Sequence, residues 1–312
     1  MTQKEALEIL KMGENAFITG AAGSGKTHLL NQYIKYLRDN GAEVGVTAST
    51  GIAATHMGGM TIHAWSGIGV RDKLTTYDME DLESKPYLWK RIEAAKVLII
   101  DEISMLHHFR LDMIEKVIRT LRRSDEPFGG LQVILCGDFF QLPPVARSGE
   151  VPALFSYHSE IWKNMDLKIC YLEEQFRQSD QVYLEVLNAI RDNNVSEKTI
   201  GHLKSRFNKK PNVEAEPTKL YSHNVNVDAE NERELFKLGG QIYEYEMSSR
   251  GRERLVETIK KSCLAPEVLR LKKGARVMFV KNNYEKGYMN GTLGVVADCD
   301  NYSISVRTAR GK

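Results

Sequence analysis

A glycine-rich segment from Gly20 to Thr27 has the residue types and the spacing of a phosphate-binding loop. It reads Gly-Ala-Ala-Gly-Ser-Gly-Lys-Thr, which fits the pattern G-x-x-x-x-G-K-[ST], and an apolar run precedes it. Glycines let successive backbone N–H groups curl around phosphate oxygens, toward which the following helix directs its positive end. We expect Lys26 to reach the β- and γ-phosphates of a nucleoside triphosphate and the Thr27 hydroxyl to bind Mg²⁺. The residues expected to contact the nucleotide in this segment are Gly20, Ala22, Gly23, Ser24, Gly25, Lys26, Thr27 and His28.

Two adjacent carboxylates follow a second apolar run, Val97 to Ile100, which is typical of a strand buried on both faces of a parallel sheet. Asp101, at the tip of this strand, is suited to hold Mg²⁺ directly or through water. Glu102 is then placed to orient or deprotonate the water that attacks the γ-phosphate. The alternative, a solvated acidic pair at a strand end, is disfavoured by the phosphate-binding segment upstream.

Two further side chains complete a predicted hydrolysis site. Gln141 follows the next apolar strand, and its amide both donates and accepts hydrogen bonds, so it can contact the γ-phosphate and hold the attacking water. Arg177 ends the segment Glu-Gln-Phe-Arg at the border of the first predicted domain. An arginine at such a border can supply positive charge to the transition state when two domains close. Taken alone, Arg177 is better interpreted as an ordinary surface arginine.

A third group of residues has the chemistry of single-stranded nucleic-acid binding. Thr50, Gly51 and Thr61 offer hydroxyls and loop N–H groups to phosphate oxygens. His63 and Trp65 offer flat rings on which bases can stack irrespective of their sequence. Packing in the core is an equally good interpretation of Trp65.

Strands and helices alternate along the first half of the chain, which predicts a doubly wound parallel sheet with helices on both faces. Ligands of such sheets bind at the carboxyl ends of the strands, where the candidate residues fall. The segment from Ser66 to Lys85 has weaker periodicity and is interpreted as a small surface insertion, and residues 193–217 are interpreted as a polar loop. The predicted strands are 17–19, 44–48, 97–100, 131–136 and 169–172, and then 219–222, 276–280, 293–297 and 304–306 in a second unit.

The composition is that of an ordinary globular protein. The chain has 312 residues and a net charge of +2, and its length suggests about two domains. Its four cysteines are scattered without a C-x-x-C pair, which argues against zinc and disulfides and favours a reducing compartment. No secretion signal and no apolar run of membrane-spanning length is present in the sequence. We expect a cytoplasmic protein, nucleoid-associated if bacterial, with no membrane partner.

Taken in order, these segments resemble the petite-integration-frequency (PIF) family of superfamily-one DNA helicases. The most specific similarity is the string Gly137 to Val145, which reads Gly-Asp-Phe-Phe-Gln-Leu-Pro-Pro-Val. The resemblance covers essentially the whole chain. The other matching segments are 20–27, 47–54, 61–63, 100–105, 127–130 and 174–177, and residues 107–128 resemble the signature of the family.

The resemblance implies two RecA-like α/β domains of the P-loop NTPase class, with ATP and Mg²⁺ between them and single-stranded DNA across both. The first domain would span residues 1–178, with a small wedge insertion at 66–85. The second, incomplete, would span 179–312, with the start of an SH3-like insertion from about 290. The resemblance also makes Gln3 the residue that reads the adenine. It adds three predicted DNA contacts, which are Pro143, His223 and Asn224.

The resemblance further implies a monomeric, DNA-stimulated ATPase that moves 5′→3′ and unwinds duplexes, forked DNA, RNA–DNA hybrids and G-quadruplexes. Its catalytic residues would be Lys26, Asp101, Glu102, Gln141 and Arg177. Family segments expected after Lys312 are missing, so we expect a truncated chain that binds nucleotide and unwinds poorly. Two other classes are compatible with the motifs: a P-loop ATPase switch that does not translocate, and a single-stranded-DNA-binding fragment with impaired catalysis.

Overall fold

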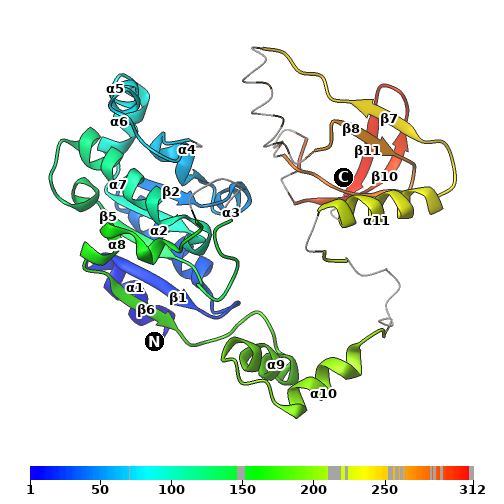
Figure 1. Cartoon of the computed structure of the whole chain (residues 1–312), viewed down its shortest axis with the longest axis horizontal. Coiled ribbons are helices and arrows are strands. Elements are labelled where there is room, and N and C mark those ends of the chain that lie inside the picture. The colour runs from blue at the N-terminus through cyan, green and yellow to red at the C-terminus, as the bar shows by residue number, and fades with distance from the viewer. Residues whose placement is uncertain are drawn as a thin grey trace. The chain divides into compact units, whose positions relative to one another are not determined.

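Six parallel strands form the central sheet of the N-terminal part of the chain, in the order β3-β2-β4-β5-β1-β6 (Figure 1). Each neighbouring pair is parallel, which confirms the predicted doubly wound arrangement. The strands are β1 (Ala16–Gly20), β2 (Val44–Ala48), β3 (Met60–Thr61), β4 (Val97–Asp101), β5 (Gln132–Cys136) and β6 (Lys168–Leu172).

The computed structural model describes residues 1–69, 71–145, 152–209, 219–221, 224–251, 256, 260, 263, 265–281, 283, 286–288 and 291–308. The chain divides into two compact units, Met1–Lys209 and Lys210–Lys312. The α-helices of the first unit are α1 (Gln3–Lys11), α2 (Lys26–Asp39), α3 (Gly51–His56), α4 (Ile62–Ser66), α5 (Thr76–Glu83), α6 (Pro86–Ala94), α7 (His108–Arg122), α8 (Glu160–Asn164), α9 (Gln181–Arg191) and α10 (Glu197–Arg206). Its short 3₁₀ turns are η1 (Ile103–Met105), η2 (Pro127–Gly130) and η3 (Ser156–His158).

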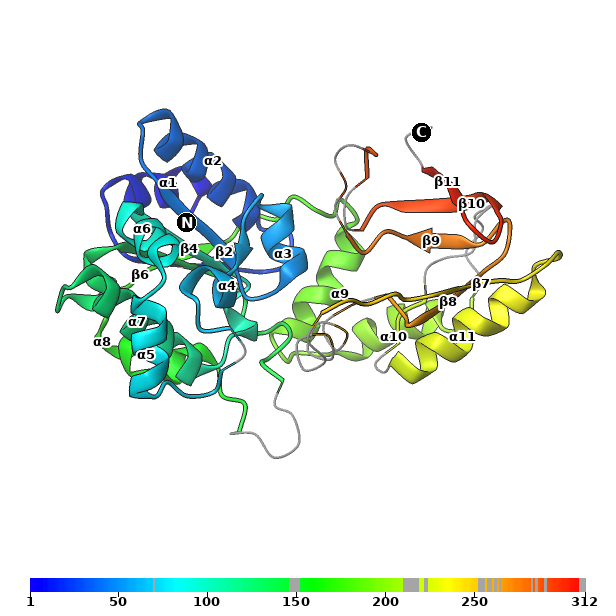
Figure 2. The same ribbon diagram turned by 90° about the horizontal axis from the view of Figure 1, so that it is seen from above.

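Helices cover both faces of this sheet, and successive strand residues contribute to two separate cores. Ile18 and Ile99 pack against α1 and α2, whereas their neighbours Phe17 and Leu98 belong to the core formed with α4 to α7. This division follows from the alternation of side chains along a strand. Figure 2 shows α1 and α2 on one side of the sheet and α5, α7 and α8 on the other.

The central and edge strands differ in burial. All five residues of β4 are buried between β2 and β5, as the continuous apolar run predicts. The predicted buried strand at 169–172 is instead an edge strand, which pairs with β1. Its residues alternate, because Ile169 and Tyr171 are 56% and 44% exposed, whereas Cys170 and Leu172 are buried.

Two segments without a strong apolar pattern form helices. Within residues 66–85, α5 places Met79 and Leu82 in the core, so this part is more than a surface excursion. Thr75 and Asp78 form a capping box that fixes its start. The predicted polar loop after α9 contains α10, which begins at the N-cap residue Ser196. In both helices, the clearest sequence signal for the start of the helix is therefore the N-cap residue and not a regular apolar pattern.

In its described residues, the second unit combines the helix α11 (Asn224–Lys237) with two small antiparallel sheets. The buried residues Leu271, Ala275, Val296 and Cys299 belong to its core. The strands predicted near 276–280, 293–297 and 304–306 are confirmed, whereas the described residues 219–221 form no strand and Leu220 is 93% exposed. The elements are α11 (Asn224–Lys237), the pair β7 (Tyr243–Glu246) and β8 (Val268–Leu271), and the sheet of β9 (Arg276–Met278), β10 (Leu293–Cys299) and β11 (Ile304–Thr308). Within the described parts of both units, no helix has the length and apolar composition needed to cross a membrane.

Candidate nucleotide-binding site

The glycine-rich segment forms a loop between β1 and α2 that needs glycine for two reasons. Gly23 and Gly25 have φ values of +88° and +83°, a backbone region in which L side chains are strained. Gly25 is the N-cap residue of α2, so the first free N–H groups of that helix face the loop. A Cβ atom on Gly23 would lie 2.6 Å from the Cβ atom of Arg177. The missing side chain therefore also admits the Arg177 segment.

Lys26 folds back over this loop. Its ammonium group donates hydrogen bonds to the backbone carbonyls of Gly20 (2.8 Å) and Ala21 (3.0 Å). Phosphate oxygens carry charge and are stronger acceptors than these neutral carbonyls. Lys26 is thus held at the loop by contacts that a triphosphate can replace.

The carboxyl end of β4 supplies the two predicted acidic residues. Asp101 is 7% exposed, and its Oδ1 accepts a hydrogen bond from the Glu102 backbone N–H (2.9 Å). Burial raises the pKa of Asp101. Burial, and then the neighbouring Asp101 charge, also raises the pKa of Glu102. A carboxylate with a raised pKa is better suited to accept a proton from water.

Gln141 lies on the loop after β5 and is held by Asp138. Its Nε2 donates to Asp138 Oδ2 (3.0 Å), and its backbone N–H donates to the Asp138 carbonyl (2.9 Å). The same carboxylate forms an ion pair with Arg191 of α9 (2.6 Å). Sequence reasoning missed this role of Asp138 and Arg191. No motif spacing joins two residues that lie 53 positions apart.

The Arg177 segment lies against the phosphate-binding loop. The backbone N–H of Phe176 donates to the carbonyl of Gly23 (2.9 Å), which fixes the neighbouring Arg177 beside the loop. From the N-terminal helix α1, Gln3 donates from Nε2 to the Ser24 carbonyl (3.3 Å). Segments far apart in the chain therefore meet at one short loop.

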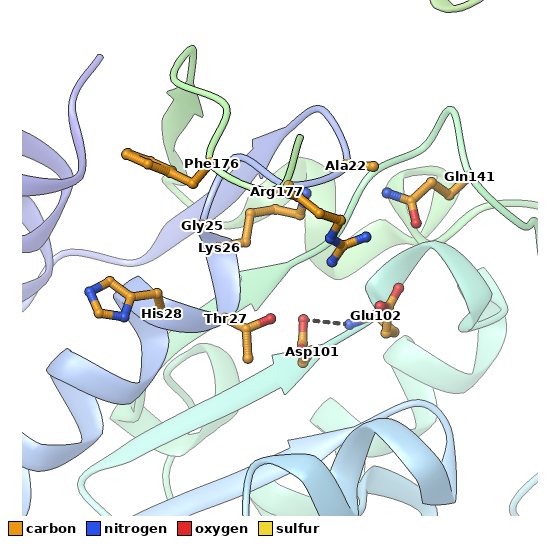
Figure 3. A pocket seen from close by; sticks show the side chains of 11 residues that line it. Ala22, Gly25, Lys26, Thr27, His28, Asp101, Glu102, Gln141, Phe176 and Arg177 are labelled. Carbon is orange, nitrogen blue, oxygen red and sulfur yellow. Dashed lines mark hydrogen bonds between the residues drawn. The ribbon is translucent and has the colours of Figure 1, made fainter. Parts of the chain in front are cut away.

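These elements surround a pocket of about 400 Å³ (Figure 3). It brings together all five predicted catalytic residues, together with Phe176, which sequence reasoning missed. Three residues predicted to bind nucleotide, Gln3, Gly20 and Ser24, do not line it. Gln3 donates to the carbonyl of Ser24, whose chain neighbours do line the pocket, and the carbonyl of Gly20 accepts a hydrogen bond from Lys26. The lining residues are Ala22, Gly23, Gly25, Lys26, Thr27, His28, Asp101, Glu102, Gln141, Phe176 and Arg177.

The pocket offers two oxygen ligands for Mg²⁺. Thr27 and Asp101 both line it, and their side chains point toward each other in Figure 3. The described residues contain no group of three or more His, Cys, Asp or Glu side chains that could hold a metal ion. Mg²⁺ commonly takes one or two protein oxygens and completes its shell with phosphates and water. The residues present therefore fit a nucleotide-borne Mg²⁺.

The predicted DNA-contacting threonines lie at the carboxyl ends of β2 and β3, which are adjacent parallel strands. Thr50 caps α3 and Thr61 caps α4, and their Oγ1 atoms accept hydrogen bonds from the N–H groups of Ala53 (3.3 Å) and Ala64 (3.2 Å). A capping hydroxyl that accepts a bond keeps its own proton for a second partner, such as a phosphate oxygen. Gly51, beside Thr50, is exposed.

The two predicted stacking residues are not equivalent. Trp65 is 3% exposed and packs in the core, which corrects the expectation that its ring is open to a base. His63 is half-buried, and burial, followed by the charge of Arg110, lowers its pKa to about 4. Pro143 is exposed on the Gln141 loop. Of the two second-unit contacts, His223 lies outside the described residues and Asn224 begins α11.

Comparison with known proteins identifies relatives of this chain. The sequence profile of PIF1-like helicases matches residues 2–199, and the profile of the 2B domain of DNA helicase Pif1 matches residues 254–298. The ATP-dependent DNA helicase Pif1 of Psychrobacter sp. (strain PRwf-1) is 50% identical over 303 residues, which are 94% of this chain and 46% of that protein. The chain thus spans about half the length of this relative.

Two solved structures share the fold. The Pif1 helicase of Candida albicans has a TM-score of 0.86 and 36% identity, covering 95% of this chain and 68% of that one. Bacteroides Pif1 bound to single-stranded DNA has a TM-score of 0.78 and 33% identity, covering 99% and 72%. The sheet and its loop have the RecA-like fold of P-loop NTPases. With a profile match over most of its length, the chain belongs to the PIF1-like helicase family.

Proposed function

We propose that this chain carries the ATP-hydrolysing and DNA-contacting machinery of a DNA helicase. The observation that carries the proposal is the convergence of five chemically distinct side chains on one pocket: Lys26, Asp101, Glu102, Gln141 and Arg177. Two cations, two carboxylates and an amide are the groups that phosphoryl transfer to water requires. Family membership supports the same assignment.

In the proposed reaction, each group has a separate task. Lys26 leaves the Gly20 carbonyl and binds the β- and γ-phosphates, while Arg177 neutralises charge on the transferred phosphoryl group. Glu102 accepts a proton from the water that Gln141 orients. Thr27 and Asp101 would hold Mg²⁺, which neutralises phosphate charge when bound. Hydrolysis then removes the γ-phosphate, and with it the contacts that would hold the two proposed domains closed around the nucleotide.

The proposed polymer is single-stranded DNA. Thr50, Gly51 and Thr61 present hydroxyl and N–H donors at the carboxyl edge of the same sheet, and His63 and Pro143 are the further contacts proposed in this unit. The similarity to Bacteroides Pif1, which was solved with single-stranded DNA, supports this choice of partner. Phosphate contacts of this kind bind DNA without reading its sequence.

We extend the proposal to the finer properties that family membership implies. These are 5′→3′ movement by a monomer and unwinding of forked duplexes, RNA–DNA hybrids and G-quadruplexes. The cellular setting would be the cytoplasm, at the nucleoid in a bacterium. The processes implied by the family as a whole are replication, recombination, repair and, in eukaryotic members, telomere maintenance. Residues 1–178 would form the first RecA-like domain, with the wedge at 66–85, and residues 179–312 would belong to the second. The compact first unit extends further, to Lys209, and so includes α9 and α10.

The experiment is steady-state ATP hydrolysis with and without a single-stranded oligonucleotide, in Mg²⁺ and in excess chelator. We expect stimulation of about tenfold by the oligonucleotide, which corresponds to about 1.4 kcal/mol in the activation free energy, and no turnover in chelator. In Mg²⁺, Lys26→Ala should abolish turnover both with and without the oligonucleotide. Hydrolysis without stimulation would identify a P-loop switch instead. DNA binding without hydrolysis would identify a binding module, and either result would overturn the proposal.

A further inference from the structure

The carboxylate of Asp138 is the centre of a buried polar network beside the pocket. Its Oδ2 accepts hydrogen bonds from Gln141 Nε2 (3.0 Å) and Arg191 Nη1 (2.6 Å), and its Oδ1 accepts from the Phe140 backbone N–H (3.2 Å). The residue is 1% exposed. A carboxylate so deeply buried is costly unless it is paired with a positive charge. Arg191 supplies that charge from another element, α9.

The charge of Asp138 determines which way the Gln141 amide points. Burial by itself raises the pKa of Asp138, but the hydrogen bonds from Arg191 and Gln141 outweigh it and leave the pKa below its ordinary value. An ionised carboxylate only accepts hydrogen bonds, so Gln141 must present its NH₂ group to it. The amide oxygen is then left to accept a hydrogen bond from water, and in Figure 3 it points to the side on which Glu102 lies.

Arg191 holds the same loop through a second contact. Its guanidinium lies over the ring of Phe140, 4.5 Å from the ring centre, and Phe140 directly precedes Gln141. Lysine and arginine both attract an aromatic face by their charge, but only the planar guanidinium can also lie flat against it. One arginine therefore fixes both the carboxylate that orients Gln141 and the backbone that carries it.

Helix α9 also contacts the segment that carries Arg177. Asn188 lies three residues before Arg191, so the two side chains share one face of the helix. The Asn188 side-chain oxygen accepts a hydrogen bond from Gln175 Nε2 (3.1 Å), two residues before Arg177. A single rigid helix thus contacts the loop of Gln141 and the loop of Arg177.

We propose that α9 is the element that positions the two γ-phosphate-facing side chains relative to each other, with Arg191 as the positioning residue for Gln141. Arg191 does not line the pocket, so it acts through Asp138 and Phe140 rather than on the nucleotide. The inference rests on the proposed ATP hydrolysis. It predicts that losing Arg191 lets the Gln141 amide turn or move away, which slows turnover without weakening ATP binding.

The test is a double-mutant cycle on kcat with Arg191→Met and Gln141→Ala. Each single variant should lower kcat about tenfold, with KM for ATP within about twofold, because the lost interaction acts in the transition state. If Arg191 works through Gln141, the double variant should be no slower than Gln141→Ala alone. Independent effects would multiply to about a hundredfold, and that result would overturn the proposal.

Lys198→Met is the matched control, because Lys198 of α10 forms an exposed ion pair with Glu185 of α9, at 71% and 59% side-chain exposure. It should leave kcat unchanged. Arg191→Lys keeps the charge and tests the stacking, and it should recover only part of the rate. Equal loss in Lys198→Met and Arg191→Met would show that the loss of any side-chain contact to α9 suffices, and it would contradict the specific role of Arg191.

A second readout separates this inference from the proposed function. ADP with aluminium fluoride occupies a nucleotide site as a phosphoryl-transfer analogue without turnover. The wild-type chain should bind it more tightly than ADP, and Arg191→Met should lose most of that increment while keeping its affinity for ADP. If the wild-type chain binds nucleotide without hydrolysing ATP, the proposed function fails, and this comparison still decides the role of Arg191. If Arg191→Met gains as much affinity from ADP to ADP–aluminium fluoride as the wild-type chain does, the proposed role of Arg191 is refuted.

Discussion

The hydroxyl of Ser49 donates a 2.7 Å hydrogen bond to the backbone carbonyl of Glu102. The backbone N–H of Ser49 also donates to the carbonyl of Asp101 (3.0 Å). Ser49 immediately precedes Thr50, the N-cap residue of α3 and a proposed DNA contact. Glu102 has a φ of +53°, which is uncommon for a residue with a side chain. The serine therefore joins the proposed DNA edge to the strained backbone of the proposed general base.

Ser49→Ala should lower DNA-stimulated hydrolysis more than basal hydrolysis. One lost hydrogen bond of about 1 kcal/mol corresponds to a factor of about five in rate if it acts only in the stimulated state. The measurement is kcat with and without a single-stranded oligonucleotide. Ser84→Ala is the matched control, since its hydroxyl also donates to a carbonyl, that of Asp81, away from the pocket. Equal losses in both rates would show that Ser49 only supports the fold.

Gly23→Ala should slow hydrolysis by displacing Arg177. The added Cβ atom would lie 2.6 Å from the Arg177 Cβ atom, at a φ of +88°. Gly13→Ala is the control for backbone strain, because Gly13 has a φ of +85° and no atom of the described residues lies within 4 Å of the added atom. Both variants should lose stability, of the order of 1 kcal/mol, but only Gly23→Ala should lose most of its kcat. Similar kcat values for the two variants would contradict the placement of Arg177.

Glu102→Gln should abolish hydrolysis and raise thermal stability at neutral pH. The folded state raises the pKa of Glu102, so it favours the protonated form more than the unfolded chain does. Glu102 therefore lowers stability as the pH rises through its folded pKa, and a neutral glutamine removes that loss. Thermal unfolding at neutral pH measures the effect, with Glu93→Gln at an exposed position as the control. A lower melting temperature in Glu102→Gln would contradict the inferred electrostatics.

His63 should make stability depend on pH below its ordinary titration range. Its pKa falls from 6.5 to about 4 in the folded chain, chiefly through burial. Between these values His63 binds more protons in the unfolded chain, so this residue alone should remove at most about 3 kcal/mol of stability as the pH falls from 6.5 to 4. Urea unfolding at the two ends of this range should show a smaller loss for His63→Gln than for wild type. The exposed His56→Gln should lose as much as wild type.

The sequence predicts those parts of the site that contiguous segments encode. The loop ending in Lys26 and the pair Asp101–Glu102 follow directly from strand–turn patterns, and the sheet brings them together because all its strands run in parallel. Periodicity also predicts β4, since a central parallel strand must be apolar on both faces. Local chemistry thus fixes the carboxyl edge of the sheet and most of the pocket.

Contacts between residues that are far apart in the sequence cannot be predicted from such local patterns. The partner of Asp138 is Arg191, which lies on a helix with no motif of its own, and only tertiary packing brings the two together. Trp65 has the chemistry of a stacking residue, but the packing of α4 on the sheet decides that its ring is buried. The helix α10 is too polar to show an apolar stripe, and its N-cap residue Ser196 is the signal that could have revealed it.

We propose that the nucleotide pocket and the DNA-contacting edge are coupled. The Kd for a single-stranded oligonucleotide, measured with no nucleotide, with ADP, and with ADP–aluminium fluoride, tests this coupling. We expect these Kd values to differ by about fivefold or more, and we expect the oligonucleotide to change nucleotide affinity by the same factor. A Kd for DNA that is the same in all three states would contradict it.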